Sequence, residues 1–266
     1  MLLAFDTATQ TASIAIYNPE TDELLGEYTW LARRKQTQDL LSTTQLMMQQ
    51  LALSPSSITG LSVTTGPGSF TGVRIGISAV KGIGLGLPVT PQVIGIPTLS
   101  VTAAAWYTCL NLSSMGQLKY AFPGQDADEL TKVRICPYIQ AGRGRYNWVF
   151  TPNSFPLAIP STSNESTDTV SRPTTLWRPE RSEHFAGSVS ELVHSLMEQA
   201  PRTILVVGEE TEELRDAVSK LSHIQMMDPI SGMRRAGQLA RLAASHFAAG
   251  QGDTLADLQP LYLRNP

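Results

Sequence analysis

The sequence predicts an α/β protein of two lobes, because β-rich segments followed by helical segments occur in the first half of the chain and again in the second. The length of 266 residues is large for a single lobe. Hydrophobic residues make up 42% and charged residues 16% of the chain, which allows a sizeable core and excludes disordered, collagen-like and coiled-coil proteins. We expect the boundary between the lobes near residues 98–110.

The first lobe is expected to begin with a meander of three strands. Residues 2–6 are apolar as far as Asp6, residues 11–17 are rich in β-formers, and residues 24–30 can form the third strand. A helix follows over 37–53, because apolar residues recur there at helical spacing. These residues are Leu40, Leu41, Met47, Met48 and Leu51.

A glycine-rich loop then connects a buried strand over 58–65 to a second helix over 73–87. It reads Gly66-Pro67-Gly68-Ser69-Phe70-Thr71-Gly72. Such a loop exposes backbone N–H groups at a helix N-terminus, which suits an anion, but the spacing is not that of a Walker A loop. We therefore interpret it as a tight crossover that lets helix and strand pack closely. Its structural positions are Gly66, Gly68, Ser69, Thr71 and Gly72.

The second helix is unusually rich in glycine, with Gly76, Gly82, Gly84 and Gly86. Each costs about 1 kcal/mol relative to alanine in a helix interior, so close approach of another element should offset the cost. Together with the pair Met47-Met48 on the preceding helix, these glycines fit either an ordinary core or a contact surface between subunits. Helical periodicity leaves both alternatives open.

The remaining elements alternate in type and are less regular. A strand over 93–96 leads into a helix from Pro97 to Leu110, and loop insertions are expected near 111–131 and 151–183. The other expected elements are strands over 133–140 and 147–151 around the turn 141–145, a helix opened by a capping box at Ser188, a strand over 203–207, a helix over 211–221 and a last helix over 231–249.

Composition excludes several functional classes. The formal net charge of −3 and the pI near 5.8 do not fit a strongly basic nucleic-acid binder. Two cysteines, Cys109 and Cys136, cannot form a disulfide framework or a cysteine-based zinc site, so a cytoplasmic protein with reduced thiols is expected. The uncharged stretch 82–118 is interrupted by Gly and Pro, and we expect neither a membrane span nor a signal peptide.

Catalytic motifs are also missing. The four histidines form no H-x-x-x-H or H-E-x-x-H pair, so no metal site is expected, and no G-x-S-x-G elbow occurs. Asp6 stands at a strand end and could orient a metal-bound nucleotide, but no glycine occurs at positions 7–9, which favours an ordinary hairpin turn. The basic runs Arg33-Arg34-Lys35 and Arg143-Gly144-Arg145 are typical of solvated surface.

Several segments occur in an order and spacing that resemble the TsaB (YeaZ) family. They are Leu3-Ala4-Phe5-Asp6-Thr7-Ala8-Thr9, the Gln38–Leu51 helix, the Gly66–Gly76 loop, Lys81-Gly82 and Ile94-Gly95-Ile96-Pro97-Thr98-Leu99. The resemblance is dense over residues 2–104, and it implies an actin-like, sugar-kinase/Hsp70-type fold of two ribonuclease-H-like lobes. On this basis we assign residues 1–104 to the first lobe, joined by the helix 231–249, and residues 105–230 to a smaller second lobe.

The resemblance also implies a function without catalysis by this chain. Members of the family are non-catalytic paralogues that pair with TsaD, which transfers threonylcarbamoyl to adenosine-37 of ANN-decoding tRNAs, and TsaE and TsaC complete the pathway. The tRNA, ATP and a metal ion would then be bound by the complex or the partner subunits, with no cofactor held firmly here and Asp6 a vestigial nucleotide-site position. The resemblance also allows a homodimer of the isolated chain.

We expect pairing with TsaD through the helices 37–53 and 73–87. The expected contact residues are Leu40, Met47, Met48, Arg74, Ile77, Ser78, Lys81, Gly82 and Leu85. Glycines 76, 82 and 84 would permit the close approach.

The chain departs from the family pattern at Gln36, at Gln140 and at Gly208-Glu209-Glu210, where histidine, an acid and a glycine–acid–glycine turn are usual. These departures argue against residual nucleotide binding by this chain and leave the fold assignment intact. Two other functional classes stay open. A small-molecule kinase or ATPase of the same fold would need a phosphate hairpin and magnesium-orienting acids in both lobes, of which only Asp6 is plausible. A peptidase would need a metal pair or a nucleophile.

Overall fold

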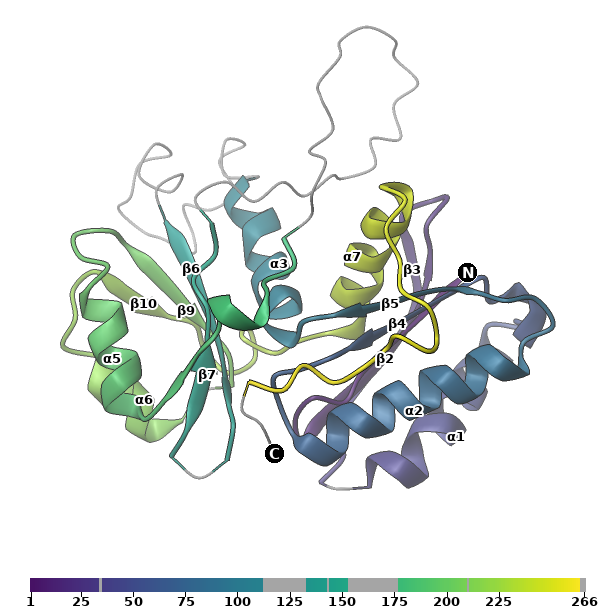
Figure 1. Ribbon diagram of the computed structural model, residues 1–266, viewed down its shortest axis with the longest axis horizontal. Helices are drawn as coiled ribbons and strands as arrows, with labels where there is room; N and C mark the ends of the chain where they lie inside the picture. The colour runs from purple at the N-terminus through teal and green to yellow at the C-terminus, as the bar shows by residue number, and fades with distance from the viewer. Residues whose placement is uncertain (34, 112–132, 143, 153–176, 210, 264–266) are drawn as a thin grey trace, which may run out of the picture. The chain divides into compact units, whose positions relative to one another are not determined.

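The computed structural model describes residues 1–33, 35–111, 133–142, 144–152, 177–209 and 211–263 (Figure 1). Two compact units emerge, each built around a five-stranded sheet. The first contains Met1–Val101 and Arg234–Tyr262, and the second contains Thr102–Phe155 and Pro179–Met233. The two insertions expected near 111–131 and 151–183 fall mainly on 112–132 and 153–176, which lie outside the described residues, as do Arg34 and Arg143.

The sheet of the first unit has the strand order β3-β2-β1-β4-β5. Its strands are β1 (Leu2–Asp6), β2 (Thr11–Asn18), β3 (Glu23–Leu31), β4 (Gly60–Thr64) and β5 (Gln92–Ile96). The first three form the expected antiparallel meander, while β4 and β5 run parallel to β1. Residues of β1 and β4 are buried throughout, as expected for central strands covered on both faces.

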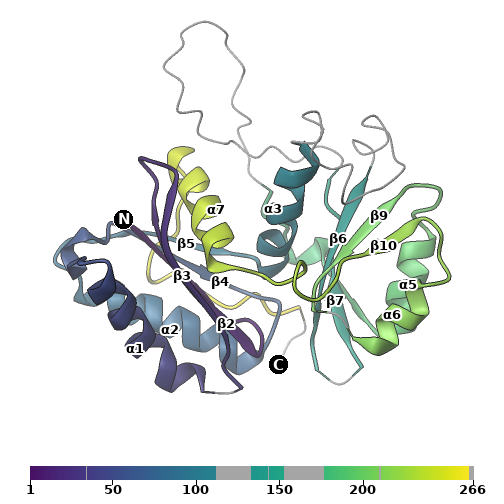
Figure 2. The ribbon, with the colours of Figure 1, turned by 180° about the vertical axis from the view of Figure 1, so that it is seen from behind.

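Helices cover both faces of this sheet. Figures 1 and 2 show α1 (Gln36–Gln50) and α2 (Phe70–Gly86) side by side on one face and α7 (Ala236–Ala248) on the other. Parallel pairing of β1, β4 and β5 requires crossover connections, which explains why α2 joins β4 to β5. A short 3-10 helix (Pro55–Ser57) precedes β4.

Several helix boundaries differ from the sequence expectation: α2 begins at Phe70 rather than at 73, α6 ends at Val218 rather than at 221, and α1 and α7 differ as follows. Helix α1 ends at Gln50 rather than near residue 53, because Ala52 takes a left-handed φ of 52°. Helix α7 begins at Ala236 rather than at 231, because the carboxylate of Asp228 accepts the N–H groups of Ile230 and Ser231 and holds them in a turn.

The sheet of the second unit has the order β10-β9-β6-β7-β8. Its strands are β6 (Arg134–Gln140), β7 (Tyr146–Trp148), β8 (Phe185–Gly187), β9 (Ile204–Val207) and β10 (Ile224–Met226). Helix α3 (Thr98–Asn111) begins in the first unit and belongs to the second from Thr102 onward. The other helices of the second unit are α5 (Val189–Met197) and α6 (Glu212–Val218), with a 3-10 turn at Arg181–Glu183. Strands β6, β7 and β8 pair antiparallel, and β9 and β10 continue parallel to β6.

Counted from its own first strand, the second sheet therefore repeats the order and direction of the first. Its core is formed by the side chains of Tyr138, Tyr146, Leu192 and Leu196 with their neighbours. The α/β class expected from the sequence is confirmed, with two sheets of one topology. Within the part of the chain that the structure describes, no helix combines the length and apolar character needed to cross a bilayer.

Candidate functional site

Asp6 ends β1 and lies inside a closed turn. Its side chain is 2% exposed. One carboxylate oxygen, Oδ1, accepts the N–H of Ala8 at 2.9 Å and the hydroxyl of Thr64 at 3.0 Å. Because an aspartate that accepts the N–H two residues on stabilises a turn, this geometry is the hairpin turn expected from the sequence.

The second oxygen of Asp6 faces a buried arginine. Nε of Arg234 lies 3.0 Å from Oδ2, and Nη2 donates to the hydroxyl of Thr9 at 3.1 Å. The two charged side chains are only 3% and 2% exposed. Buried charges are tolerated when they are paired and hydrogen-bonded. A guanidinium thus neutralises the one acid that could have oriented a metal-bound nucleotide. Sequence reasoning missed Arg234, because a single arginine before a helix carries no local signal.

The glycine-rich loop packs directly on this turn. A Cβ at Gly68 would lie 2.3 Å from the carbonyl oxygen of Ala8, and a Cβ at Gly72 would lie 2.1 Å from that of Thr7. The N–H of Ser69 donates to the Ala8 carbonyl at 2.6 Å, and the Ser69 hydroxyl caps α2 by accepting the N–H of Gly72. The loop has the geometry of a tight crossover, and Thr71 is exposed beside it.

The glycines of α2 divide into two groups. Gly76 approaches Thr7 and Val63, and Gly84 approaches Leu255, so both permit close packing inside the first unit. Nothing lies within 4 Å of a Cβ placed at Gly82 or Gly86. The sequence expectation that 76, 82 and 84 all serve a partner is therefore corrected for 76 and 84, whose space is filled by their own lobe.

The residues expected to contact a partner also divide. Leu40, Met47 and Ile77 are 1%, 1% and 5% exposed, because they pack beneath the two helices. Met48 and Lys81 are half-buried, and Lys81 donates from Nζ to the carbonyl of Ala256. Of the residues expected to contact a partner, four are exposed on α2: Arg74, Ser78, Gly82 and Leu85.

Further apolar side chains of α1, of α2 and of the segment after α2 are exposed. Leu85 is 79% exposed, Val89 75%, Leu41 53% and Leu46 47%. The sequence did not predict Leu46 as a contact residue, because it lies among glutamines on the expected polar face of α1. These residues and the exposed part of α2 (Ser78, Gly82) are called the outer helix surface below.

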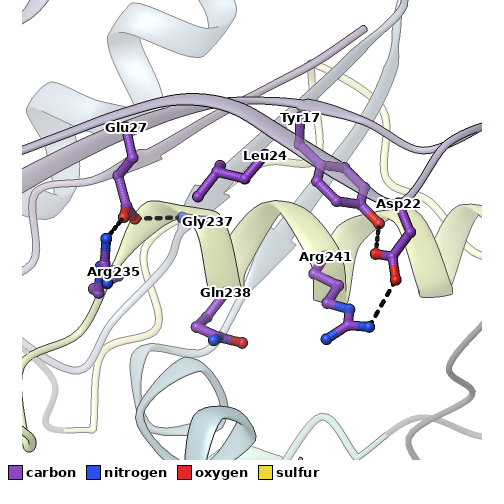
Figure 3. Close-up of a pocket in the computed structure, with 8 residues that line it drawn as sticks. All are labelled: Tyr17, Asp22, Leu24, Glu27, Arg235, Gly237, Gln238 and Arg241. Carbon is purple, nitrogen blue, oxygen red and sulfur yellow. Dashed lines mark hydrogen bonds and ion pairs between the residues drawn. The ribbon is translucent and has the colours of Figure 1, made fainter.

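A hollow of about 240 Å³ lies between the β2–β3 hairpin and α7 (Figure 3). Glu27, held by the N–H of Gly237 at 2.8 Å, pairs with Arg235, and Asp22 pairs with Arg241 at 2.8 Å. Tyr17 donates to Asp22, and burial together with this hydrogen bond raises the pKa of the phenol. Each charge in the hollow is matched by an opposite one, and the contacts fasten α7 to the sheet.

Groups that could ligate a metal are dispersed. Among the described residues, no three His, Cys, Asp or Glu side chains come close enough together to hold an ion. Burial lowers the pKa of His246 and of His184, and burial raises the pKa of the Cys136 thiol. These groups therefore remain neutral near pH 7.

Comparison with known proteins identifies similar chains. A family model described as TsaD, tRNA N6-adenosine threonylcarbamoyltransferase, matches residues 29–113. The tRNA threonylcarbamoyladenosine biosynthesis protein TsaB of Escherichia coli (strain K12) is 27% identical over 265 residues, which cover 99% of this chain and 94% of the relative. The TsaB protein of Haemophilus influenzae is 35% identical over 92 residues, 34% of this chain and 38% of the relative.

A solved structure shows the same fold. The chain of YeaZ from Pseudomonas aeruginosa superimposes with a TM-score of 0.58 at 20% identity, and 98% of each chain is covered. Together with the repeated sheet topology, this confirms the actin-like, two-lobed α/β fold class. The family match, the relatives and the shared fold agree that the chain is similar to proteins named TsaB and YeaZ.

Proposed function

We propose that this chain is a non-catalytic subunit in the biosynthesis of threonylcarbamoyladenosine-37 in ANN-decoding tRNAs, acting by binding TsaD. The names of its relatives support the role in tRNA threonylcarbamoyladenosine biosynthesis. In this proposal TsaD, assisted by TsaE and supplied by TsaC, holds ATP, the metal ion and the tRNA, and the whole reaction takes place in the cytoplasm.

The ion pair between Asp6 and Arg234 carries the non-catalytic part of the proposal. A carboxylate must present its oxygens to a metal ion in order to position a nucleotide phosphate. Both oxygens of Asp6 are occupied by Ala8, Thr64 and Arg234, and the side chain is buried. Opening that position would leave the Arg234 charge buried without its partner, which is energetically costly.

The outer helix surface carries the docking part of the proposal. Large apolar side chains such as Leu85 and Leu41 are exposed there, and burial of such side chains against a partner would favour a protein–protein contact. Gly82 and Gly86 leave open space above α2, so a partner helix can approach the backbone closely. A helix pair of TsaD packed on α1 and α2 fits both features.

The test is complex formation measured by light scattering on a sizing column. We expect this chain and TsaD from the same organism to give a new peak of one-to-one mass. Gly82→Glu should abolish that peak because it places a charge in the contact. The thermal midpoint of this variant should stay near that of the unmodified chain, which shows that the monomer is still folded. Ser222→Glu, at an exposed position of the second unit, is the matched control and should still form the complex.

Two outcomes would contradict the proposal. Unshifted peaks for the unmodified chain, with and without nucleotide and TsaE, would remove the docking function. Calorimetric ATP binding in the micromolar range with turnover would instead favour a kinase or ATPase of the same fold. A complex of unchanged affinity with Gly82→Glu would remove only the outer helix surface as its site.

A further inference from the structure

The first turns of α2 carry an exposed cluster of one arginine and two aromatic rings, formed by Phe70, Arg74 and Tyr262. The guanidinium carbon of Arg74 lies 3.7 Å from the centroid of the Phe70 ring and 5.6 Å from that of Tyr262. Nε of Arg74 donates to the Tyr262 hydroxyl at 2.7 Å, and the two ring centroids are 5.6 Å apart. Phe70 is 49% exposed, so the cluster lies at the surface.

Arg74 differs from four other arginines of the first unit. Arg178, Arg234, Arg235 and Arg241 each pair with a carboxylate. Among the described residues, no acidic side chain forms an ion pair with Arg74. The hydrogen bond from Arg74 to Tyr262 uses Nε, and a guanidinium carries four further N–H groups in a planar fork that matches a carboxylate.

The cluster is held in place before any partner binds. Tyr262 follows Leu261, whose N–H donates to the carbonyl of Thr65 at 2.7 Å. Leu258 is 2% exposed and anchors the same tail segment in the core. Because a rotamer fixed in advance loses little entropy on binding, this arrangement favours recognition by Arg74.

The cluster is also continuous with the outer helix surface. Positions 74, 78 and 85 fall on one side of a helix with 3.6 residues per turn, and all three are exposed in α2. A partner that covers Ser78 and Leu85 would therefore reach Arg74. The apolar character of Leu85 and Phe70 and the net charge of −3 favour a protein over a polyanionic RNA.

We propose that Phe70, Arg74 and Tyr262 bind an aspartate or glutamate side chain of the protein that docks on α2. Arg74 donates to the carboxylate, Tyr262 positions the guanidinium, and the Phe70 ring packs on apolar atoms beside the acid. This inference rests on the proposed docking function and adds the chemistry of the partner and the part played by the C-terminal tail.

The test is the Kd of the complex with TsaD from the same organism, measured by calorimetry. Arg74→Lys keeps the charge but loses the fork and the ring stacking, and we expect Kd to rise about ten- to a hundredfold. Tyr262→Phe keeps the ring but removes the oriented hydroxyl, and a smaller increase is expected. Arg215→Lys in the exposed part of α6 is the matched control and should leave Kd unchanged.

The thermal midpoint of each variant confirms that the chain is folded, and Tyr262→Phe keeps the test decisive if Arg74→Lys is unstable. A Kd unchanged in both variants, while Gly82→Glu abolishes binding, would overturn this inference and leave the docking function standing. Absence of binding by the unmodified chain would overturn the docking function itself. A loss of tRNA affinity by Arg74→Lys alone, with the Kd for TsaD unchanged, would assign the cluster to RNA and overturn the inference.

Discussion

The two units share one sheet topology, but the turn after the first strand is covered in the first unit and open in the second. In the first unit, Asp6 and Thr7 in the turn after β1 are 2% and 0% exposed, and the glycine-rich loop and Arg234 cover them. In the second unit, Gln140 at the end of β6 is exposed. There Gly142 and Gly144 take left-handed φ values of 108° and 64° with nothing within 4 Å of a Cβ at either.

This difference shows that the strand order of a sheet and the closure of its first turn are determined by different residues. The order and direction of five strands follow from a meander and two crossovers, which each unit has. What fills the space beyond the first turn depends on distant residues, since Arg234 reaches Asp6 across 228 positions of the chain. One topology can therefore carry a closed turn in one unit and an open turn in the other.

Removal of Arg234 should have the largest effect. Arg234→Met leaves the Asp6 carboxylate buried without its counter-ion, and we expect a loss of about 3–5 kcal/mol in the free energy of unfolding, measured in urea. Gln140→Ala, at the corresponding open turn, should change it by less than about 0.5 kcal/mol. Equal effects of the two variants would show that the two turns do not differ as described.

A methyl group on the glycine-rich loop should have the next largest effect. Gly72→Ala forces a Cβ against the Thr7 carbonyl, and a loss of about 1–3 kcal/mol is expected from overpacking. Gly82→Ala in the same helix meets open space and should stabilise the monomer by up to about 1 kcal/mol, since alanine is the better helix former. Thermal denaturation of both variants measures the contrast, and a destabilised Gly82→Ala would contradict it.

Helix caps should contribute alike in both units. The Ser188 hydroxyl accepts the N–H of Glu191 in a capping box, and the Ser69 hydroxyl accepts that of Gly72. Each serine-to-alanine change should cost about 1 kcal/mol in urea unfolding. A much larger cost at Ser69 would indicate that its hydroxyl also supports the packing of the loop on the turn.

Acidification should have the mildest effect near neutrality. Burial lowers the pKa of His246 in the first unit and of His184 in the second below the ordinary value of 6.5. The unfolded chain then binds protons that the folded chain does not, so stability is full above pH 6.5 and falls as the pH drops through that value. Urea midpoints at several pH values measure the slope. His246→Gln should reduce that slope.

Local sequence patterns predicted most of the fold. The alternation of β1 to β3, the helical spacing of α1 and the capping box of α5 placed these elements to within a few residues. Helix α1 was too long in the prediction because nothing in the sequence reveals the left-handed conformation of Ala52. The candidate contact surface was harder to predict than the fold, because Leu40 and Leu41 fit the same helical pattern. Leu40 is nevertheless 1% exposed and Leu41 53% exposed.

The sequence by itself determined the α/β class, the order of most elements but not strands β8 and β10, the glycine-rich crossover and the resemblance to TsaB, because each depends on neighbouring residues or on a short string. The tertiary structure decided which helix residues face outward, which glycines of α2 are filled from within and what neutralises Asp6. Arg234, Leu255 and Tyr262 reach their partners from far along the chain. Such contacts are fixed by the packing of the whole unit, which no local pattern encodes.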